Sequence, residues 1–333
     1  MGDMGLGVDG YLRTQKEAAY GTPVVAAMVL LPVKEGADIN HNVANIEQAN
    51  LISSRVKQDP CFGRKTTIGS VPIDMHPSLI GELWNYLFGA ASSVAVGDNA
   101  YTHTWIQDLT AEQDGSIFTI QFAKGSELAE QYVSCQINKI SIEANNEGNS
   151  MVTFELIAKD RTTDVARITS FSYPALCPFR FSQLVISEAG LGALEVDNMT
   201  LEIDMNYDVE RYKLGDATPK RVKFNGIPTV MMNLTLDADQ QFSDAAIAHT
   251  EYDFTLVWTS SENAGTTPTK YSQTIELPGC RINPDSAASP FTPERLKMEL
   301  EIDCGYGGVS TGSGTDPVMF EFRIVDDTTA YTA

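Results

Sequence analysis

Acidic side chains alternate with apolar ones along three segments of the chain, and their spacing limits the chemistry that they can do. Residues 199–208 have the cleanest alternation, and residues 140–145 and 298–303 repeat it more briefly. A pair of catalytic carboxyl groups needs two different environments to separate their pKa values, and equivalent neighbours on one open strand face do not provide them. We therefore interpret these acids as a charged strand surface. Its members are Glu143, Glu202, Asp204, Asp208, Glu299 and Glu301.

This acidic surface has two interpretations. Half-buried antiparallel strands ordinarily turn one polar side to water, which is sufficient to explain the alternation. The charge is nevertheless of one sign, so several copies that closed into a ring with these sides inward would surround a bore that repels phosphate. The residues alone favour neither interpretation.

Basic side chains are concentrated in two loop segments. As solvated turns they need no partner. In an assembly they could instead meet acids of the next subunit, and one basic and one acidic surface would then set the direction of stacking. The residues concerned are Arg55, Lys57, Arg64, Lys65, Lys220 and Arg221.

Motifs for cofactors and metals are weak in this chain. The run Gly5-Leu6-Gly7-Val8-Asp9-Gly10 fits the G-x-G-x-x-G pattern, but a dinucleotide site needs a strand before it, and only four residues precede this run. The four histidines lie far apart. A calcium site at Asp237, Asp239 and Asp244 is one interpretation of this cluster, although helix capping or solvation explains these aspartates equally well. We predict no catalytic residues, no cofactor and no metal site.

The composition describes a folded chain with a strongly negative charge. Among 333 residues, 43% are hydrophobic, and 44 Asp and Glu against 23 Lys and Arg give a formal net charge of −21, which argues against a groove that grips nucleic acid. The five cysteines are widely spaced and form no CxxC, which predicts reduced, mostly buried thiols rather than a disulfide framework or a zinc site. We find no signal-peptide pattern and no apolar run long enough to span a bilayer, so we expect synthesis in the cytoplasm.

The elements that must carry these residues are mostly strands. An irregular arm over residues 1–26 is expected to precede a first strand near residues 28–33, and strands at 43–56 and 66–74 flank a loop at 59–65. An amphipathic helix follows, with Pro77 in its first turn and Gly89 at its end. Its apolar face consists of Leu79, Ile80, Leu83, Trp84, Leu87 and Phe88, which should pack on a sheet.

The same order of elements recurs in the second half of the chain. Residues 138–160 and 297–327 each contain an alternating strand, a turn and a Phe-Glu-hydrophobic strand. The landmark pairs agree in spacing, since Asp74 and Asp237 differ by 163 residues (237 − 74) and Phe154 and Phe320 by 166 (320 − 154). A second helix is expected near residues 240–249. We predict a mainly β protein of two tandem β-sandwich or barrel-like domains, each with one flanking α-helix.

The predicted boundaries follow from this repeat and from a turn-rich stretch between the halves. The divisions are an N-terminal arm at 1–26, a first domain at 27–163, a linker at 164–178, a second domain at 179–327 and a loose tail at 328–333.

The order of elements resembles the tail tube proteins of long-tailed bacteriophages, in particular those in which the tube domain is duplicated. The resemblance rests on the leading arm, the Tyr20-Gly21-Thr22-Pro23 turn, the basic loop at 55–65, the single helix and the long antiparallel strands. It implies a structural protein of the virion, made in the host cytoplasm, whose rings stack into a hollow tube with an acidic lumen for DNA ejection.

The resemblance also implies partners. Three duplicated chains would form a ring that acts as a pseudo-hexamer, and the ring would contact the tape-measure protein and the tail terminator and tip proteins. Genomic DNA would pass through the lumen without specific binding, and no membrane would be involved.

Two other classes of protein stay open. One is another virion β protein, such as a neck, terminator or capsid-decoration subunit, or a tube of a related contractile injection machine. The other is a β-sandwich carbohydrate-binding or hydrolytic domain, which would display aromatic platforms or separated carboxyl groups in a cleft. Trp84, Trp105 and Trp258 instead lie in apolar patterns, which predicts that they are buried.

Overall fold

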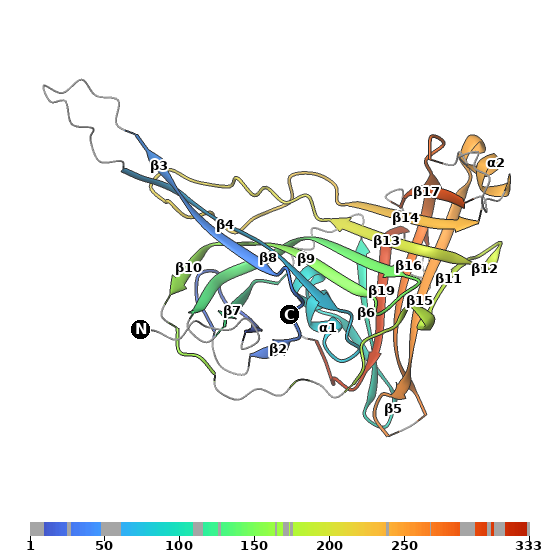
Figure 1. Ribbon diagram of the computed structural model, residues 1–333, viewed down its shortest axis with the longest axis horizontal. Helices are drawn as coiled ribbons and strands as arrows, with labels where there is room; N and C mark the ends of the chain where they lie inside the picture. The colour runs from blue at the N-terminus through green and yellow to red at the C-terminus, as the bar shows by residue number, and fades with distance from the viewer. Residues whose placement is uncertain are drawn as a thin grey trace, which may run out of the picture.

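The computed structural model describes most of the chain as antiparallel β-structure with two short helices (Figure 1). The predicted mainly β fold class is confirmed. The residues described are 10–24, 28–47, 61–108, 116–125, 128–163, 165–168, 173, 176–237, 240–266, 268–286, 297–304, 308–309 and 317–331.

The first half contains ten of the described strands and the more apolar of the two described helices. These strands are β1 (Tyr11–Lys16), β2 (Val29–Leu31), β3 (Asp38–Ile46), β4 (Cys61–Asp74), β5 (Ser92–Gly97), β6 (Ala100–Asp108), β7 (Phe118–Lys124), β8 (Leu128–Asn145), β9 (Met151–Ala158) and β10 (Asp160–Thr163), with the helix α1 (Ile80–Phe88) between β4 and β5. Residues 61–65, which the sequence assigns to a loop, belong to β4, so that expectation is wrong.

The second half begins with a single 3-10 turn at Phe181–Gln183. Its elements are β11 (Leu184–Glu188), β12 (Gly192–Leu194), β13 (Val196–Asp204), β14 (Thr229–Asp237), α2 (Gln240–Ala248), β15 (Glu251–Asn263), β16 (Lys270–Ile282), β17 (Lys297–Asp303), β18 (Gly308–Val309) and β19 (Pro317–Asp326).

The strand pairings of the first half recur in the second in the same order. In the first half they are β1·β2, β1·β7, β7·β8, β8·β10, β8·β9, β4·β9 and β3·β4. In the second half they are β11·β12, β11·β15, β15·β16, β16·β19, β16·β17, β14·β17 and β13·β14. Each strand of the first set therefore has a counterpart in the second, and the hairpin β5–β6 is additional.

These pairings correct the register of the repeat. Asp74 and Asp237 are equivalent, because each ends the strand before a helix. Phe154 and Phe320 are not, because β9 corresponds to β17, whereas Phe320 lies in β19, the counterpart of β10. The Phe-Glu-hydrophobic pattern misleads because every half-buried strand shares its period of two.

The two halves are joined through strands as well as through the chain. β8 pairs with β13, and β6 pairs with β19, so sheets continue from one half into the other. The division into domains at residues 164–178 stays a prediction.

Helix α1 packs between the halves, and the core is continuous around it. Trp84 is fully buried, its ring centroid lies 4.6 Å from that of Phe322 in β19, and its indole N–H donates to Gln273 Oε1 at 2.9 Å. Gly89, with φ of 87°, ends the helix as expected. The prediction that this apolar face packs on a sheet is confirmed.

The ends of the chain are more ordered than expected. Residues 1–9 lie outside the described part, but Tyr11 and Leu12 in β1 are buried between β2 and β7. The expected loose tail includes Tyr331, which is 4% exposed and donates its hydroxyl to Asp326 Oδ2 at 2.8 Å. Its ring also packs against Trp105 in β6, with the ring centroids 5.4 Å apart. Both expectations are wrong because each short segment gains its order from distant strands, which local composition does not reveal.

The cysteines also differ from expectation. Cys280, in β16, and Cys304, just after β17, form a disulfide and are fully buried. Of the three cysteines outside the disulfide, Cys135 is buried, whereas Cys61 and Cys177 are exposed. The prediction of reduced and mostly buried thiols is therefore wrong, because the fold brings together two cysteines that stand 24 residues apart.

Removing this disulfide should weaken the fold. We expect the double variant Cys280→Ala/Cys304→Ala to lose about 2–4 kcal/mol of unfolding free energy, because the unfolded chain regains the freedom of the closed loop. Urea denaturation with and without reductant measures the effect. Reductant should destabilise the parent chain but leave the double variant unchanged, and equal stability of parent and variant would contradict the prediction.

Candidate functional site

A long antiparallel sheet runs through both halves of the molecule. Its strand order is β3-β4-β9-β8-β13-β14-β17, with the junction between the halves at β8–β13. Figure 1 shows β3 toward one end of the long axis and β14 and β17 toward the other. One face packs into the core through buried residues such as Ile140, Ile142, Leu201, Ile203, Leu234 and Leu300.

The opposite face gathers the predicted acids. Thr200 lies opposite Glu143 in β8 and Asn233 in β14, and Asn233 in turn lies opposite Glu301 in β17. Directly opposed residues of antiparallel strands project from the same side. Alternation along each strand adds the remaining members. This acidic face therefore contains Glu143, Glu202, Asp204, Glu299 and Glu301.

Two further acids on this face were not among the predicted residues. Glu155 lies opposite Lys139, and Asp303 lies opposite Met231, and both acids are exposed. Both acids alternate with apolar neighbours in the sequence, and this pattern could have identified them as exposed strand positions. Local pattern could not show that β9 stands beside β8 in this sheet.

Asp208 departs from the predicted row. The strand β13 ends at Asp204, and Asn206 has a positive φ of 51°, which turns the chain out of the extended conformation. The Asp208 amide then donates to the Lys223 carbonyl at 2.8 Å within the following loop. Asp208 is therefore not part of the acidic face as defined by the strands.

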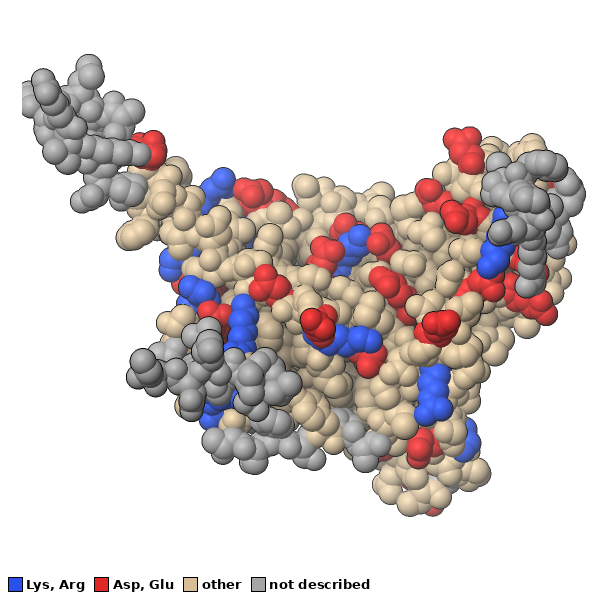
Figure 2. All heavy atoms as spheres, in the orientation of Figure 1, with Lys and Arg blue, Asp and Glu red and all other residues tan. Residues whose placement is uncertain are grey.

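The acidic face also contains lysines. Lys139 Nζ lies 3.0 Å from Glu202 Oε2, and this hydrogen bond raises the pKa of Lys139. Lys297, the first residue of β17, has its Nζ 2.7 Å from Asp197 Oδ2. In Figure 2, acidic groups gather toward the end of the molecule where β14 and β17 lie. The arrangement is a surface of excess negative charge, interrupted by single ion pairs.

The predicted basic residues make contacts within the chain. Lys65 Nζ lies 3.0 Å from Asp160 Oδ2, and Arg64 lies 2.6 Å from Glu210 Oε2. Lys220 pairs with Asp216 at 2.5 Å, a hydrogen bond that lowers the pKa of Asp216. Arg221 accepts through its carbonyl a bond from Arg211 at 2.6 Å. Their role between subunits stays a prediction, and Arg55 and Lys57 lie outside the described residues.

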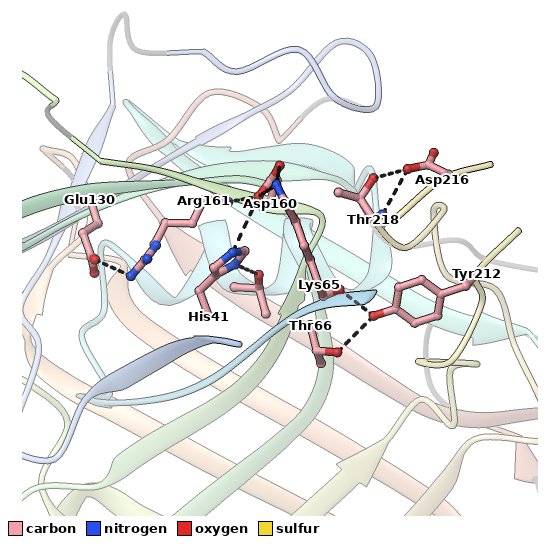
Figure 3. Close-up of polar contacts among 10 residues, drawn as sticks. His41, Lys65, Thr66, Glu130, Asp160, Arg161, Tyr212, Asp216 and Thr218 are labelled. Carbon is pink, nitrogen blue, oxygen red and sulfur yellow. Dashed lines mark hydrogen bonds and ion pairs between the residues drawn. The ribbon is translucent and has the colours of Figure 1, made fainter. Parts of the chain in front are cut away.

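These contacts hold the loop after β13 against β4 (Figure 3). The Tyr212 hydroxyl donates to the Lys65 carbonyl at 2.6 Å and lies 3.1 Å from Thr66 Oγ1. The Lys65 amide donates to the Ala217 carbonyl at 2.8 Å, and Tyr20 donates its hydroxyl to Pro219 at 2.8 Å. A loop of the second half is thus fastened to the first half beside the β8–β13 junction.

The pKa of His41, in β3, departs from its usual value, so we expect the stability of this region to depend on pH. Burial and the positive charge of Arg161 lower the pKa of His41 below its usual 6.5, and Asp160 opposes the shift only in part. Around and below pH 6.5 the unfolded chain therefore binds more protons than the folded one, so stability falls as the pH drops toward the folded pKa. We expect His41→Gln to show a shallower loss of unfolding free energy between about pH 7 and 5. Parallel pH profiles of parent and variant would contradict this.

The other motifs gain no support from the structure. Gly5 and Gly7 of the glycine-rich run and Asp239 of the aspartate cluster lie outside the described residues. The part of the chain that is described contains no group of three or more His, Cys, Asp or Glu arranged to hold a metal. Trp84, Trp105 and Trp258 are buried, as predicted. Neither described helix is long enough to cross a membrane.

A sheet of this extent, with an apolar face in the core and an acid-rich face exposed, defines a mainly β protein with one long, charged sheet surface. A family model described as phage tail tube protein matches residues 7–322, and the chain belongs to this family of structural tail proteins. The chain is thus a tube subunit of the virion tail, and such subunits self-assemble into a tube. No curated protein matches the chain.

Proposed function

We propose that copies of this chain close into rings that stack into a hollow tube, with the acidic face lining the bore through which DNA leaves the virion. The observation that carries the proposal is the continuous sheet whose exposed face combines Glu143 and Glu299 from opposite halves. If every copy turned its acidic face inward, the negative charges would repel the phosphates of DNA. Salt screens this repulsion beyond roughly 8–10 Å at physiological ionic strength. DNA would then pass through the bore without binding to its wall.

A ring of three chains fits this proposal. Each chain contains the same set of strand pairings in both of its halves, so three chains supply six similar halves. We also propose that the tube meets the tape-measure protein inside and the terminator and tip proteins at its ends. The chain would need no cofactor and no catalysis for this work. Symmetry in electron micrographs of purified tubes, together with native mass spectrometry of rings, tests the number of chains.

Charge reversal tests the bore. Glu143→Lys/Glu299→Lys removes two exposed acids from the face and adds two positive charges, so assembled tubes should bind free DNA at low salt and release it as salt rises. The matched control is Glu147→Lys/Glu262→Lys, which makes the same charge change at exposed positions outside the face. Equal DNA binding by the two variants would contradict an acidic bore, whereas failure of the parent chain to form tubes would contradict the assembly itself.

A further inference from the structure

The loop between β13 and β14 (residues 205–228) contains a dipeptide that can react with itself. It is Asn225-Gly226, the one Asn-Gly pair of the sequence. The backbone nitrogen that follows an asparagine can attack the carbonyl carbon of the asparagine side chain. A side chain on the following residue hinders this approach, and glycine has none. Whether the reaction proceeds in the folded chain depends on how the fold holds the two residues.

The fold leaves this dipeptide accessible. Asn225 and Gly226 are both exposed. Within the described residues, neither the Asn225 side chain nor the Gly226 amide has a hydrogen-bond partner. A β-carbon added to Gly226 would lie 2.4 Å from Asn206 Nδ2, so this position has no room for a side chain that would shield the amide. The Asn225 side chain can therefore turn toward the Gly226 nitrogen.

The residues on either side of the dipeptide are held in place. The Asn225 amide donates to the Asn206 carbonyl at 2.8 Å, and the Asn206 side-chain amide donates to the Ile227 carbonyl at 3.4 Å. Phe224 pairs with Tyr207, and their ring centroids lie 5.0 Å apart. The reactive peptide bond thus lies between fixed neighbours at the base of the loop.

A second dipeptide with similar chemistry is protected. Asn149-Ser150 also places a small residue after an asparagine. Ser150 is fully buried, and its amide donates to the Phe179 carbonyl at 2.8 Å. This nitrogen cannot attack without local unfolding. The two dipeptides therefore give a comparison within one chain between an accessible and a protected asparagine.

We propose that Asn225 is a site of spontaneous deamidation that the fold leaves reactive. The Gly226 nitrogen loses its proton to a base and bonds to Asn225 Cγ, while the side-chain nitrogen takes up a proton and leaves as ammonia. Water then opens the resulting five-membered imide at either carbonyl. One product is aspartate, and the other is isoaspartate, in which the backbone runs through the side-chain methylene. This chemistry is independent of the proposed assembly into rings.

The modification would act on the loop that fastens the two halves together. Either product adds one negative charge close to the end of β13, where the Asp204 carboxylate accepts the Asn206 amide at 2.7 Å. Isoaspartate also lengthens the backbone by one atom beside the bond between Asn225 and Asn206. We expect it to loosen the base of the loop, and with it the contact of Tyr212 with Lys65 (Figure 3).

Peptide mapping by mass spectrometry tests the site. The full-length chain is incubated at mildly alkaline pH, either folded or in guanidinium chloride, and each asparagine is followed by a mass increase of about 1 Da. Relative to the unfolded chain, the fold should slow the reaction at Asn149 by about a hundredfold or more, and at Asn225 by less than about tenfold. Protection of Asn225 by about tenfold or more would overturn the proposal.

Two variants separate the added charge from the change in the backbone. Freshly prepared Asn225→Asp has the charge without the extra backbone atom, and Asn225→Gln stays neutral and should react much more slowly. The Lys65 amide, which donates to the Ala217 carbonyl of the loop at 2.8 Å, provides the measurement. Its hydrogen exchange should rise by about twofold or more in the parent as isoaspartate accumulates, but not in either variant. Unchanged exchange in the modified parent would overturn the loosening of the loop.

Discussion

The variant Trp84→Ala should lose about 3–5 kcal/mol of unfolding free energy, because it removes a fully buried indole from a well-packed core. The loss includes the contact with Phe322, 4.6 Å between ring centroids, and the hydrogen bond to Gln273. Both partners belong to the second half, whereas Trp84 belongs to the first. We therefore expect the two halves to lose stability together.

Urea denaturation followed by circular dichroism and by fluorescence measures this effect. The two signals should give one coincident transition, shifted to lower urea in the variant. Leu214→Ala is the matched control, since Leu214 is fully exposed and its truncation should change stability by less than about 0.5 kcal/mol. A loss below about 1 kcal/mol for Trp84→Ala would contradict the packing described for α1.

The second large effect is expected at Glu17, which is 3% exposed. Its carboxylate accepts the Thr119 hydroxyl at 2.6 Å, the Ser134 amide at 2.7 Å and the Ser134 hydroxyl at 2.6 Å. Ser134 has a φ of 52°, in the left-handed region, so this carboxylate also holds an unfavourable backbone conformation. Glu17→Ala leaves a buried amide without its acceptor, and we expect a loss of about 3 kcal/mol.

Glu17→Gln is the informative comparison at this site. Glutamine retains one carbonyl oxygen as an acceptor, so the variant should lose distinctly less unfolding free energy than Glu17→Ala. Hydrogen exchange of the Ser134 amide provides a local measurement, and its protection should fall most in the alanine variant. Equal losses for the two substitutions would show that the side-chain volume, not the acceptor, accounts for the effect.

Local patterns in the sequence predicted the elements better than their partners. The apolar face around Trp84 and the Gly89 stop predicted α1, and alternation around Leu201 predicted β13. Both features depend on residues close together in the chain. The burial of Tyr11 in β1 depends instead on β7, more than a hundred residues away, and composition contains no trace of that contact.

The acidic face illustrates the same limit. Alternation correctly identified Glu202 and Glu301 as polar positions of strands, but only the pairings through Asn233 place them on one side of one sheet. The false equivalence of Phe154 and Phe320 arose from the same cause. A period of two is common to all half-buried strands, so it can identify a strand without identifying its neighbours.

The β8–β13 junction also affects how fast an assembly can form. In any closed ring of these chains joined edge to edge, every second junction would be this intramolecular one, already formed when the chain folds. Tethering two partners on one chain gives them an effective concentration on the order of millimolar, which free subunits at low concentration do not reach. A subunit with two such halves therefore lowers the number of collisions that nucleation requires, and each half can change its own surface without changing the other.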